Sequence, residues 1–429
     1  MKRLNVEIKW SVICLGLMFI LQSPSFAQKN YSEFKGKVVD ARNNKALEYV
    51  SLNVLETNIS TVTNSEGEFL LKVPETYSNS KVVVALLGYS KKVLNLSDLS
   101  DNISVIKLEE VYTELSEVSV SAFKDAGRLV RKVFEEKDKT IQNESVYMTA
   151  FYRETIKRRN RNVSLTEAVV NILKQPYTSK NRDAVKLGKA RKSTDYKRLD
   201  TLSVKLQGGP FSTLYLDIMK YPEYIFTEET LETYRFTFDP PSTVNNKNVY
   251  VVDFKPRNKT LDLSYFGKLY IDVETLALVS ASYSLDVSNK GKSRNLLVKR
   301  KPRDVVVYPL EANYKVDYKQ QGNKWYYSYS NLSLKFKVNK KREIFNKVYT
   351  LSSEMAVTDW EINTDDLKIK PKDRLRPSVI ITDAISGFSD PDFWGEYNLI
   401  EPDKSIESAI EKIIKNIKKE EERLEESLP

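Results

Sequence analysis

The sequence predicts a mainly β protein of the α+β class, in which a small N-terminal β-sandwich precedes a larger antiparallel sheet domain with a few helices. Three observations predict this. Residues 30–110 hold short strand-like runs separated by turn signals, at the spacing of a sandwich. Residues 247–360 alternate apolar and polar side chains, as strands with one wet face do. Helical spacing of apolar residues appears in two places, near residues 130 and 410.

The first 27 residues have the parts of a signal peptide. Basic residues precede an apolar core from Trp10 to Leu21, and Ser25-Phe-Ala27 fits a cleavage site that needs small residues. An uncleaved membrane anchor is the alternative, but the apolar run is short for a span. We therefore expect export, with cleavage before Gln28, and a periplasmic or outer-membrane-associated location in a Gram-negative-type envelope. No later stretch is long and apolar enough to predict a transmembrane helix.

Two side chains that carry much enzyme chemistry are almost missing. The chain has no histidine, and its single cysteine, Cys14, lies inside the predicted signal peptide. Histidine is the usual general base near neutral pH and the commonest metal ligand, and the thiolate is a strong nucleophile. The mature chain is therefore expected to lack Ser-His-Asp and Cys-His catalysis, disulfides and imidazole- or thiolate-bound metal. We expect no cofactor, no metal and no enzymatic activity.

The net charge is positive. It is +10 for the whole chain, and removal of residues 1–27 leaves about +8. Such a charge favours an anionic lipid, a lipopolysaccharide or an acidic envelope protein as partner, and peripheral membrane association would follow. Solubility alone is the simpler explanation. Nucleic acid is not expected as the partner of an exported chain.

Four motifs in the first domain suggest a family. They are Gly36-Lys-Val-Val-Asp40, Val50-Ser-Leu-Asn-Val54, Thr63-Asn-Ser-Glu-Gly-Glu-Phe69 and Leu87-Gly-Tyr89. Together they resemble the carboxypeptidase regulatory-like domain. The resemblance implies an Ig-like or transthyretin-like sandwich over residues 28–110. It implies no peptidase activity, because the zinc ligands of the neighbouring catalytic domain in metallocarboxypeptidases include histidine.

A linking strand and one amphipathic helix, predicted over 125–138, occupy residues 111–145. The strand that follows ends in Phe151-Tyr-Arg-Glu154. With Glu167-Ala-Val169 downstream, it resembles an uncharacterised envelope family whose members follow the sandwich with a helix and a "FYRE" segment. Residues 174–205 are polar and basic and predict a mobile or surface-lying connection.

Residues 146–400 are expected to form the larger domain. Gly267-Lys-Leu-Tyr-Ile-Asp272 and Thr275-Leu-Ala-Leu278 predict two strands joined by a turn. This hairpin resembles those of half-barrel lipoprotein carriers, in which a curved sheet and a helix enclose an apolar cavity. Residues 401–429 predict a C-terminal helix followed by an acidic tail.

The candidate binding residues fall in two groups. Tyr152, Arg153 and Glu154 can present an Arg-Glu pair to a ligand, but a core strand with a structural salt bridge explains them better. The second group consists of Phe393, Trp394 and Tyr397.

These aromatic residues suit a recognition surface, or they plug the end of the half-barrel, which is the simpler explanation. The basic runs 157–161 and 299–301 can meet anionic headgroups, although solvated loops are the usual cause of such runs.

Catalysis without histidine needs carboxylate pairs or a Ser-Lys pair. Asp365-Asp366 and Glu228-Glu229 are neighbours in sequence, and neighbours on a strand point to opposite faces. Ser121-Ala-Phe-Lys124 has the Ser-x-x-Lys spacing without its supporting motifs. The sequence therefore favours a non-enzymatic envelope protein that acts as a binding or scaffold module. A lipid or lipopeptide carrier and a histidine-free hydrolase using Asp/Glu or Ser/Lys remain the alternatives.

Overall fold

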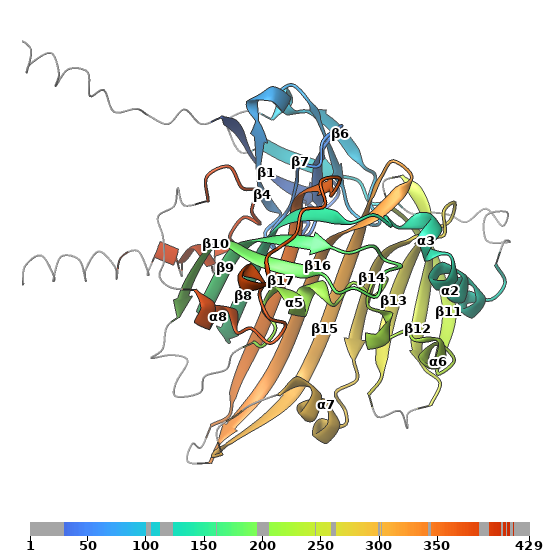
Figure 1. Cartoon of the computed structure of the whole chain (residues 1–429), viewed down its shortest axis with the longest axis vertical. Coiled ribbons are helices and arrows are strands. Elements are labelled where there is room, and N and C mark those ends of the chain that lie inside the picture. The colour runs from blue at the N-terminus through green and yellow to red at the C-terminus, as the bar shows by residue number, and fades with distance from the viewer. Residues whose placement is uncertain are drawn as a thin grey trace, which may run out of the picture.

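The computed structural model places two β-rich domains against each other (Figure 1). It describes residues 30–99, 104–111, 123–159, 161–194, 206–244, 246–258, 263–298, 301, 303–341, 345–385, 394–404, 406–408, 410–411 and 415. The predicted signal peptide (1–27), Phe393 and the acidic tail lie outside these residues.

The N-terminal domain is a sandwich of two sheets. One is three-stranded in the order β4-β1-β7, and the other is four-stranded in the order β3-β2-β5-β6. The elements are β1 (Tyr31–Asp40), β2 (Ser51–Val54), β3 (Ser60–Val62), β4 (Glu68–Pro74), β5 (Lys81–Ala85), β6 (Lys92–Asn95), β7 (Ser104–Leu108) and the short 3₁₀ helices η1 (Glu75–Tyr77) and η2 (Leu96–Asp98). Apolar residues of both sheets, among them Leu52, Phe69 and Leu71, form a separate core.

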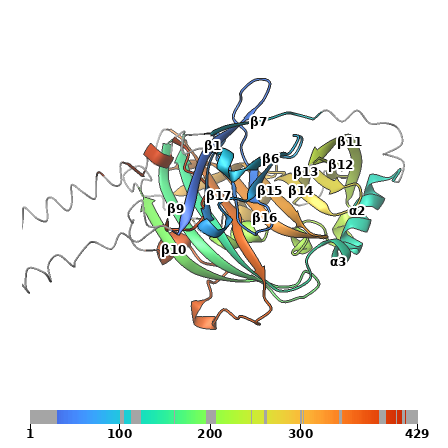
Figure 2. The same ribbon diagram turned by 90° about the horizontal axis from the view of Figure 1, so that it is seen from above.

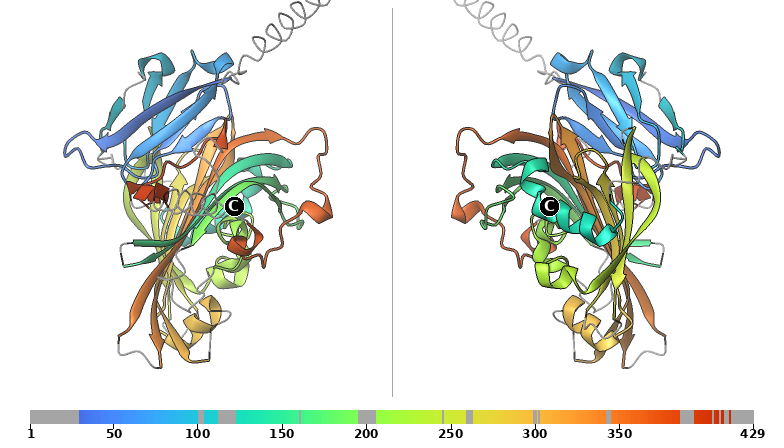
Figure 3. Two further views of the ribbon diagram at one scale, coloured as in Figure 1. Left: turned by 90° about the vertical axis from the view of Figure 1, so that its left-hand side faces the viewer. Right: turned by 90° about the vertical axis from the view of Figure 1, so that its right-hand side faces the viewer.

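The larger domain is one antiparallel sheet of ten strands in the order β10-β9-β8-β17-β16-β15-β14-β13-β12-β11. Its strands are β8 (Val146–Arg158), β9 (Arg161–Lys174), β10 (Ala184–Thr194), β11 (Tyr234–Val244), β12 (Lys247–Pro256), β13 (Tyr265–Asp272), β14 (Leu278–Leu285), β15 (Val305–Gln321), β16 (Lys324–Lys340) and β17 (Lys347–Ile362). The sheet curves, and the sandwich lies on its convex side (Figures 2 and 3). The predicted fold class is confirmed.

Short helices accompany this sheet. They are α2 (Ala126–Glu135), α3 (Lys137–Thr140), α5 (Pro210–Leu214), η3 (Pro222–Tyr224), α6 (Glu228–Leu231), α7 (Lys290–Leu297), η4 (Pro371–Asp373) and α8 (Ile381–Ala384). Asp125 caps α2 by accepting a hydrogen bond from the Arg128 amide, which is the usual N-cap arrangement. Within the described ranges, no helix has the length and apolar character needed to cross a membrane.

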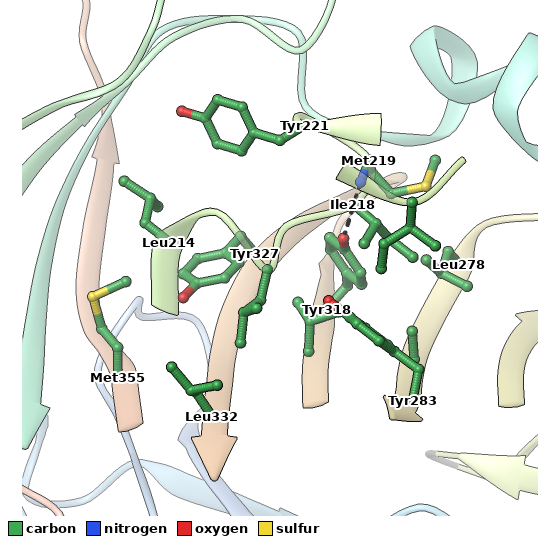
Figure 4. Packing of buried hydrophobic residues seen from close by; sticks show 14 of the residues in the cluster. Leu214, Ile218, Met219, Tyr221, Leu278, Tyr283, Tyr318, Tyr327, Leu332 and Met355 are labelled. Atoms are coloured by element: carbon green, nitrogen blue, oxygen red, sulfur yellow. Dashed lines mark hydrogen bonds between the residues drawn. The ribbon is translucent and has the colours of Figure 1, made fainter. Parts of the chain in front are cut away.

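Side chains fill the described part of the concave face. Residues 206–226, which include α5, cross this face, and Leu214, Ile218 and Met219 pack on the strands (Figure 4). Large aromatic residues such as Tyr283 and Tyr327 meet them from the sheet. The Tyr318 hydroxyl accepts a hydrogen bond from the Met219 amide at 3.3 Å.

A buried ionic cluster fixes the crossing segment to the sheet. The Lys174 ammonium lies 2.8 Å from Asp183 and 2.7 Å from Asp217, and all three side chains are at most 1% exposed. Tyr177 and Tyr318 donate hydrogen bonds to Asp217, and Tyr221 donates one to Asp183. Burial alone would lower the pKa of Lys174, but the two carboxylates outweigh it and raise that pKa above its usual value. The cation therefore stays charged inside the core.

The sequence-based expectation for residues 174–205 differs from the structure. Lys174 is buried, and Ala184–Thr194 is β10, the edge strand of the sheet, while 195–205 lie outside the described residues. Lysines are common on edge strands because they discourage pairing with another chain. Because β10 contains several lysines, its composition resembles that of a surface loop, and the sequence pattern did not indicate a strand.

Replacement of Lys174 by methionine is expected to lower the free energy of unfolding by about 3–5 kcal/mol, because two buried carboxylates lose their cation. Urea denaturation of the protein measures this loss. Lys180→Met, at an exposed position nearby, should change stability by less than about 0.5 kcal/mol. Equal effects of the two substitutions would contradict the role of the cluster.

Candidate functional site at the domain interface

The FYRE strand sends its side chains to both faces of the sheet. Tyr152 belongs to the concave core, whereas Phe151 belongs to a smaller cluster beneath the sandwich. Because successive residues on a strand alternate, Arg153 and Glu154 point to opposite sides and make no pair with each other. All four residues are buried.

Arg153 belongs to a charged row that crosses four strands. In register across the sheet lie Arg191 on β10, Glu167 on β9, Arg153 on β8 and Glu354 on β17. Arg191 Nε lies 2.6 Å from Glu167 Oε2, Arg153 Nε lies 2.8 Å from Glu167 Oε1, and Arg153 Nη1 lies 3.3 Å from Glu354 Oε1. We call these four residues the charged row.

Opposite charges alternate along the charged row, so each ion faces a partner in a buried place. Burial alone would raise the pKa of Glu167, but Arg153 and Arg191 outweigh it and hold that pKa below its usual value. Glu354 has less compensation, and burial raises its pKa despite Arg153 and a hydrogen bond from Tyr329. A buried ion that lost its partner here would be strongly destabilising.

The charged row holds a C-terminal segment, residues 394–403, which we call the clasp. Arg153 Nη2 donates a hydrogen bond to the Ile400 carbonyl at 2.6 Å. Trp394 is 3% exposed, with its ring edge-to-face on Phe151 at 5.8 Å and the Arg191 guanidinium 5.1 Å from its centroid. These contacts bind the clasp to the large sheet.

The same segment is bound to the sandwich. The Asn398 side chain pairs with the backbone of Lys72: its Oδ1 accepts from the Lys72 amide at 2.7 Å, and its Nδ2 donates to the Lys72 carbonyl at 2.9 Å. Thr61 Oγ1 donates to the Leu399 carbonyl at 2.8 Å, and Asn64 Nδ2 donates to the Pro402 carbonyl at 3.2 Å. The clasp therefore joins the two domains.

Two of the three predicted aromatic residues, Trp394 and Tyr397, lie within the described part of the chain. Trp394 lies between the domains, and Tyr397 is half-buried with the Lys189 ammonium 5.6 Å from its ring centroid. Phe393 lies outside the described residues. The structure brings Trp394 next to Phe151 and binds Arg153 to Ile400 of the same segment, whereas Tyr152 and Glu154 lie on the other face of the sheet.

A cavity of about 90 Å³ lies between the sandwich and the sheet. Ser51 and Asn53 of β2 line one side, and Lys315, Asp317 and Lys319 of β15 line the other. This volume suits a few waters or a small ion, and it is below the 300–1,000 Å³ of typical ligand pockets.

Polar contacts link the cavity to the charged row. Lys315 pairs with Asp317 at 3.0 Å, and its ammonium lies 5.0 Å from the ring centroid of Tyr49. Tyr49 contacts the Tyr329 ring at 5.1 Å, and the Tyr329 hydroxyl donates to Glu354 at 3.3 Å.

Lys319 differs from Lys315. It is half-buried beside the cavity, and burial lowers its pKa to about 8, an effect that Asp359 offsets only in part. A lysine with so little compensation is a natural contact for an anion.

Among the described residues, no cation forms an ion pair with Glu154. Its side chain is buried and accepts a hydrogen bond from the Tyr152 hydroxyl at 2.9 Å. Burial raises its pKa to about 7, and the hydrogen bond from Tyr152 lowers it only in part. Ser212 and Ser353 also lie near the Tyr152 hydroxyl, in the packed concave core. Among the described residues, no group of three acidic side chains is arranged to hold a metal ion.

Comparison with known proteins identifies the first domain. Residues 34–120 match the family model of the CarboxypepD_reg-like domain. The resemblance seen in the four sequence motifs is therefore confirmed for this domain, which is about a fifth of the chain. The expected likeness of the larger domain to a FYRE-type family stays a prediction.

Other comparisons add little. No curated protein matches the sequence. Among solved structures, the chain is similar to a DUF1329 family protein from Desulfovibrio piger ATCC 29098, with 11% identity and a TM-score of 0.24. The match covers 57% of this chain and 96% of that one. So low a TM-score carries no inference about fold or function.

Sequence reasoning missed the cavity and the Lys174 cluster. Of the charged row it named only Arg153 as a candidate, and it did not predict that Arg191, Glu167 and Glu354 join it. One signal was available: Glu167 and Glu354 are acids inside otherwise strand-like stretches. A charge in the middle of a buried strand demands a partner. The partner itself became visible only with the register between strands.

Glu154→Gln is expected to stabilise the protein at pH 8 by about 3 kcal/mol and to leave stability at pH 4 nearly unchanged. The folded pKa is raised from 4.5 to about 7, so the native state favours the protonated acid. Stability therefore falls as pH rises through this window, and glutamine, which still accepts from Tyr152, removes that fall.

Urea denaturation at several pH values measures the free energy of unfolding of the wild type and of Glu154→Gln. Glu167→Gln is the matched control and should destabilise at pH 8, because Arg153 and Arg191 lose their shared carboxylate. A parallel pH dependence in wild type and Glu154→Gln would contradict the assignment.

Proposed function

We propose that this protein is a non-enzymatic, exported component of the cell envelope that works as a binding scaffold. The observation that carries the proposal is the clasp, which is bound to the charged row on one side and to the sandwich on the other. Domains joined in this way act as one body with fixed distances between their surfaces. Such a body suits the positioning of partners.

Contacts outside the clasp support the same view. Ser60 Oγ donates to the Val357 carbonyl at 3.0 Å, and the Asn58 side chain donates to the Trp360 carbonyl. The Gly88 amide donates to the Thr243 carbonyl at 2.6 Å, at the opposite edge of the large sheet. Interdomain contacts distributed over several strands oppose hinge motion, which is the default for small polar interfaces.

The strongly perturbed groups favour a scaffold over an enzyme. Lys174 is enclosed by two aspartates and several tyrosine rings, and Glu154 lies in the concave core. A catalytic acid or base has to reach its substrate. The packing of the described concave face likewise favours a scaffold over a carrier that needs an apolar cavity.

Export and envelope location rest on the N-terminal sequence. The basic start, the short apolar core and the small residues before Gln28 support secretion. Fractionation of cells that make the full chain tests this, with Gln28 expected as the mature N-terminus. Hydrolysis of envelope glycans, peptides or esters by the purified mature protein would contradict the non-enzymatic proposal.

Loosening the clasp tests the scaffold directly. Asn398→Ala removes both hydrogen bonds to the Lys72 backbone and should lower the free energy of unfolding by about 1–3 kcal/mol. Hydrogen exchange should rise at 394–403 and at the facing strands β3 and β4. Glu396→Ala, exposed in the same segment, is the control and should behave like wild type. Unchanged exchange in Asn398→Ala would remove the clasp as the joining element.

A second candidate function is binding of a small anion in the interface cavity, which Lys319 favours. Inorganic phosphate, compared with chloride at equal ionic strength, should raise the melting temperature of the wild type more than that of Lys319→Met. Lys107→Met, an exposed position on the sandwich, should keep the wild-type response. An equal response in all three proteins would exclude this binding.

A further inference from the structure

Positive charge is concentrated at one end of the large sheet. The described residues of segments 157–161, 301–305 and 337–347 include ten lysines and arginines and one acid, a net of +9 against +10 for the whole chain. The ten are Lys157, Arg158, Arg159, Arg161, Lys301, Arg303, Lys337, Lys340, Lys341 and Lys347, and the acid is Asp304. The rest of the chain is therefore almost neutral.

Strand register brings these segments together, although more than 100 residues separate the first from the second. Val305 pairs with Lys340, Val338 pairs with Lys347, and Tyr349 pairs with Arg158. The turn between β8 and β9 therefore lies beside the turn between β16 and β17, and the start of β15 lies on its other side. We call this part of the surface the basic end.

The basic end projects from the body. β15 and β16 have 17 residues each and β17 has 16, whereas β13 and β14 have 8 each. In Figures 1 and 3 these long strands run to the bottom of the molecule, and the sandwich lies at the top. The ends of β15, β16 and β17 are thus accessible from the side opposite the sandwich, whereas Lys157 beside the β8–β9 turn pairs with Asp403 of the clasp at 3.6 Å.

An apolar side chain stands among the charges. Phe345, at the turn between β16 and β17, is 81% exposed. Arg161, Arg303 and Lys341, one from each segment, are also exposed. The same end of the sheet therefore offers cations that can bind phosphates and an exposed phenylalanine that can enter an apolar medium.

We propose that the basic end is a docking surface for an anionic lipid bilayer. Its cations contact lipid phosphates, and Phe345 enters the boundary between headgroups and acyl chains. This deepens the proposed scaffold and rests on it, because the clasp then holds the sandwich at a fixed height above the membrane. A nucleic acid is not expected as the occupant, because the proposed function places the chain in the cell envelope.

The distribution of the cations favours a membrane over a soluble acidic protein as the partner. The cations come from the ends of five adjacent strands, β9, β8, β17, β16 and β15, and form the rim of a sheet. Charges spread over five strand ends suit a partner whose phosphates are spread over an extended surface. Long lysine and arginine side chains also adapt to a laterally mobile set of headgroups.

Vesicle co-sedimentation of the mature protein tests the proposal. Vesicles of phosphatidylcholine with phosphatidylglycerol should bind it, vesicles of phosphatidylcholine alone should not, and binding should fall as sodium chloride is raised. A triple variant, Arg161→Gln with Arg303→Gln and Lys341→Gln, should lose about tenfold to a hundredfold in affinity. Phe345→Ser should weaken binding severalfold without a change in melting temperature, because its side chain is mostly exposed.

The matched control carries the same charge change on the sandwich: Lys45→Gln with Lys92→Gln and Lys107→Gln, all at exposed positions. It should bind like wild type. Absence of vesicle binding, an equal loss in both triple variants, or tighter binding to a nucleic acid than to anionic vesicles would overturn the proposal. If vesicles fail to bind while Asn398→Ala still uncouples the domains, the scaffold stands and only the docking surface falls.

Discussion

The structure depends on an alternation of buried charges across four strands. Arg191, Glu167, Arg153 and Glu354 each face an opposite charge on the next strand, so that none of them is buried without compensation. Two of their guanidinium groups then reach beyond the sheet, one to the Ile400 carbonyl and the other to the Trp394 ring. Loss of one member would leave its partner buried without compensation, and an alternative register of these strands would do the same. The position of the clasp, and through it the contact with the sandwich, therefore depends on the charged row.

The sheet and the first domain were predictable because their signals are local. The turn Asn64-Ser-Glu-Gly67 and the alternation of Tyr314, Val316 and Tyr318 depend only on neighbouring residues. Helix α2 falls inside the predicted 125–138 range for the same reason. Where composition misled, at β10, the cause was also local, since an edge strand rich in lysine has the polarity of a loop.

The candidate site was less predictable because it is built from long-range contacts. The alternation of β15 correctly gives a polar face with Lys315, Asp317 and Lys319, but that face is covered by the sandwich instead of water. The sequence of β15 alone does not predict that the sandwich packs over this face. The same holds for the basic runs, which look like separate loops in the sequence and become one surface only through the register of adjacent strands.

The position of the clasp within the chain has a consequence for assembly. It lies some 320 residues after its partner Lys72 and about 240 after Arg153, so it leaves the ribosome after nearly all of both domains. Until then, the apolar patch formed by Phe151, Tyr329 and Ala356 lacks its cover. Binding of the clasp to the two domains is therefore a late step in folding, and it joins segments that are far apart in the chain. A chain cut short before the clasp would expose that apolar patch to chaperones and proteases.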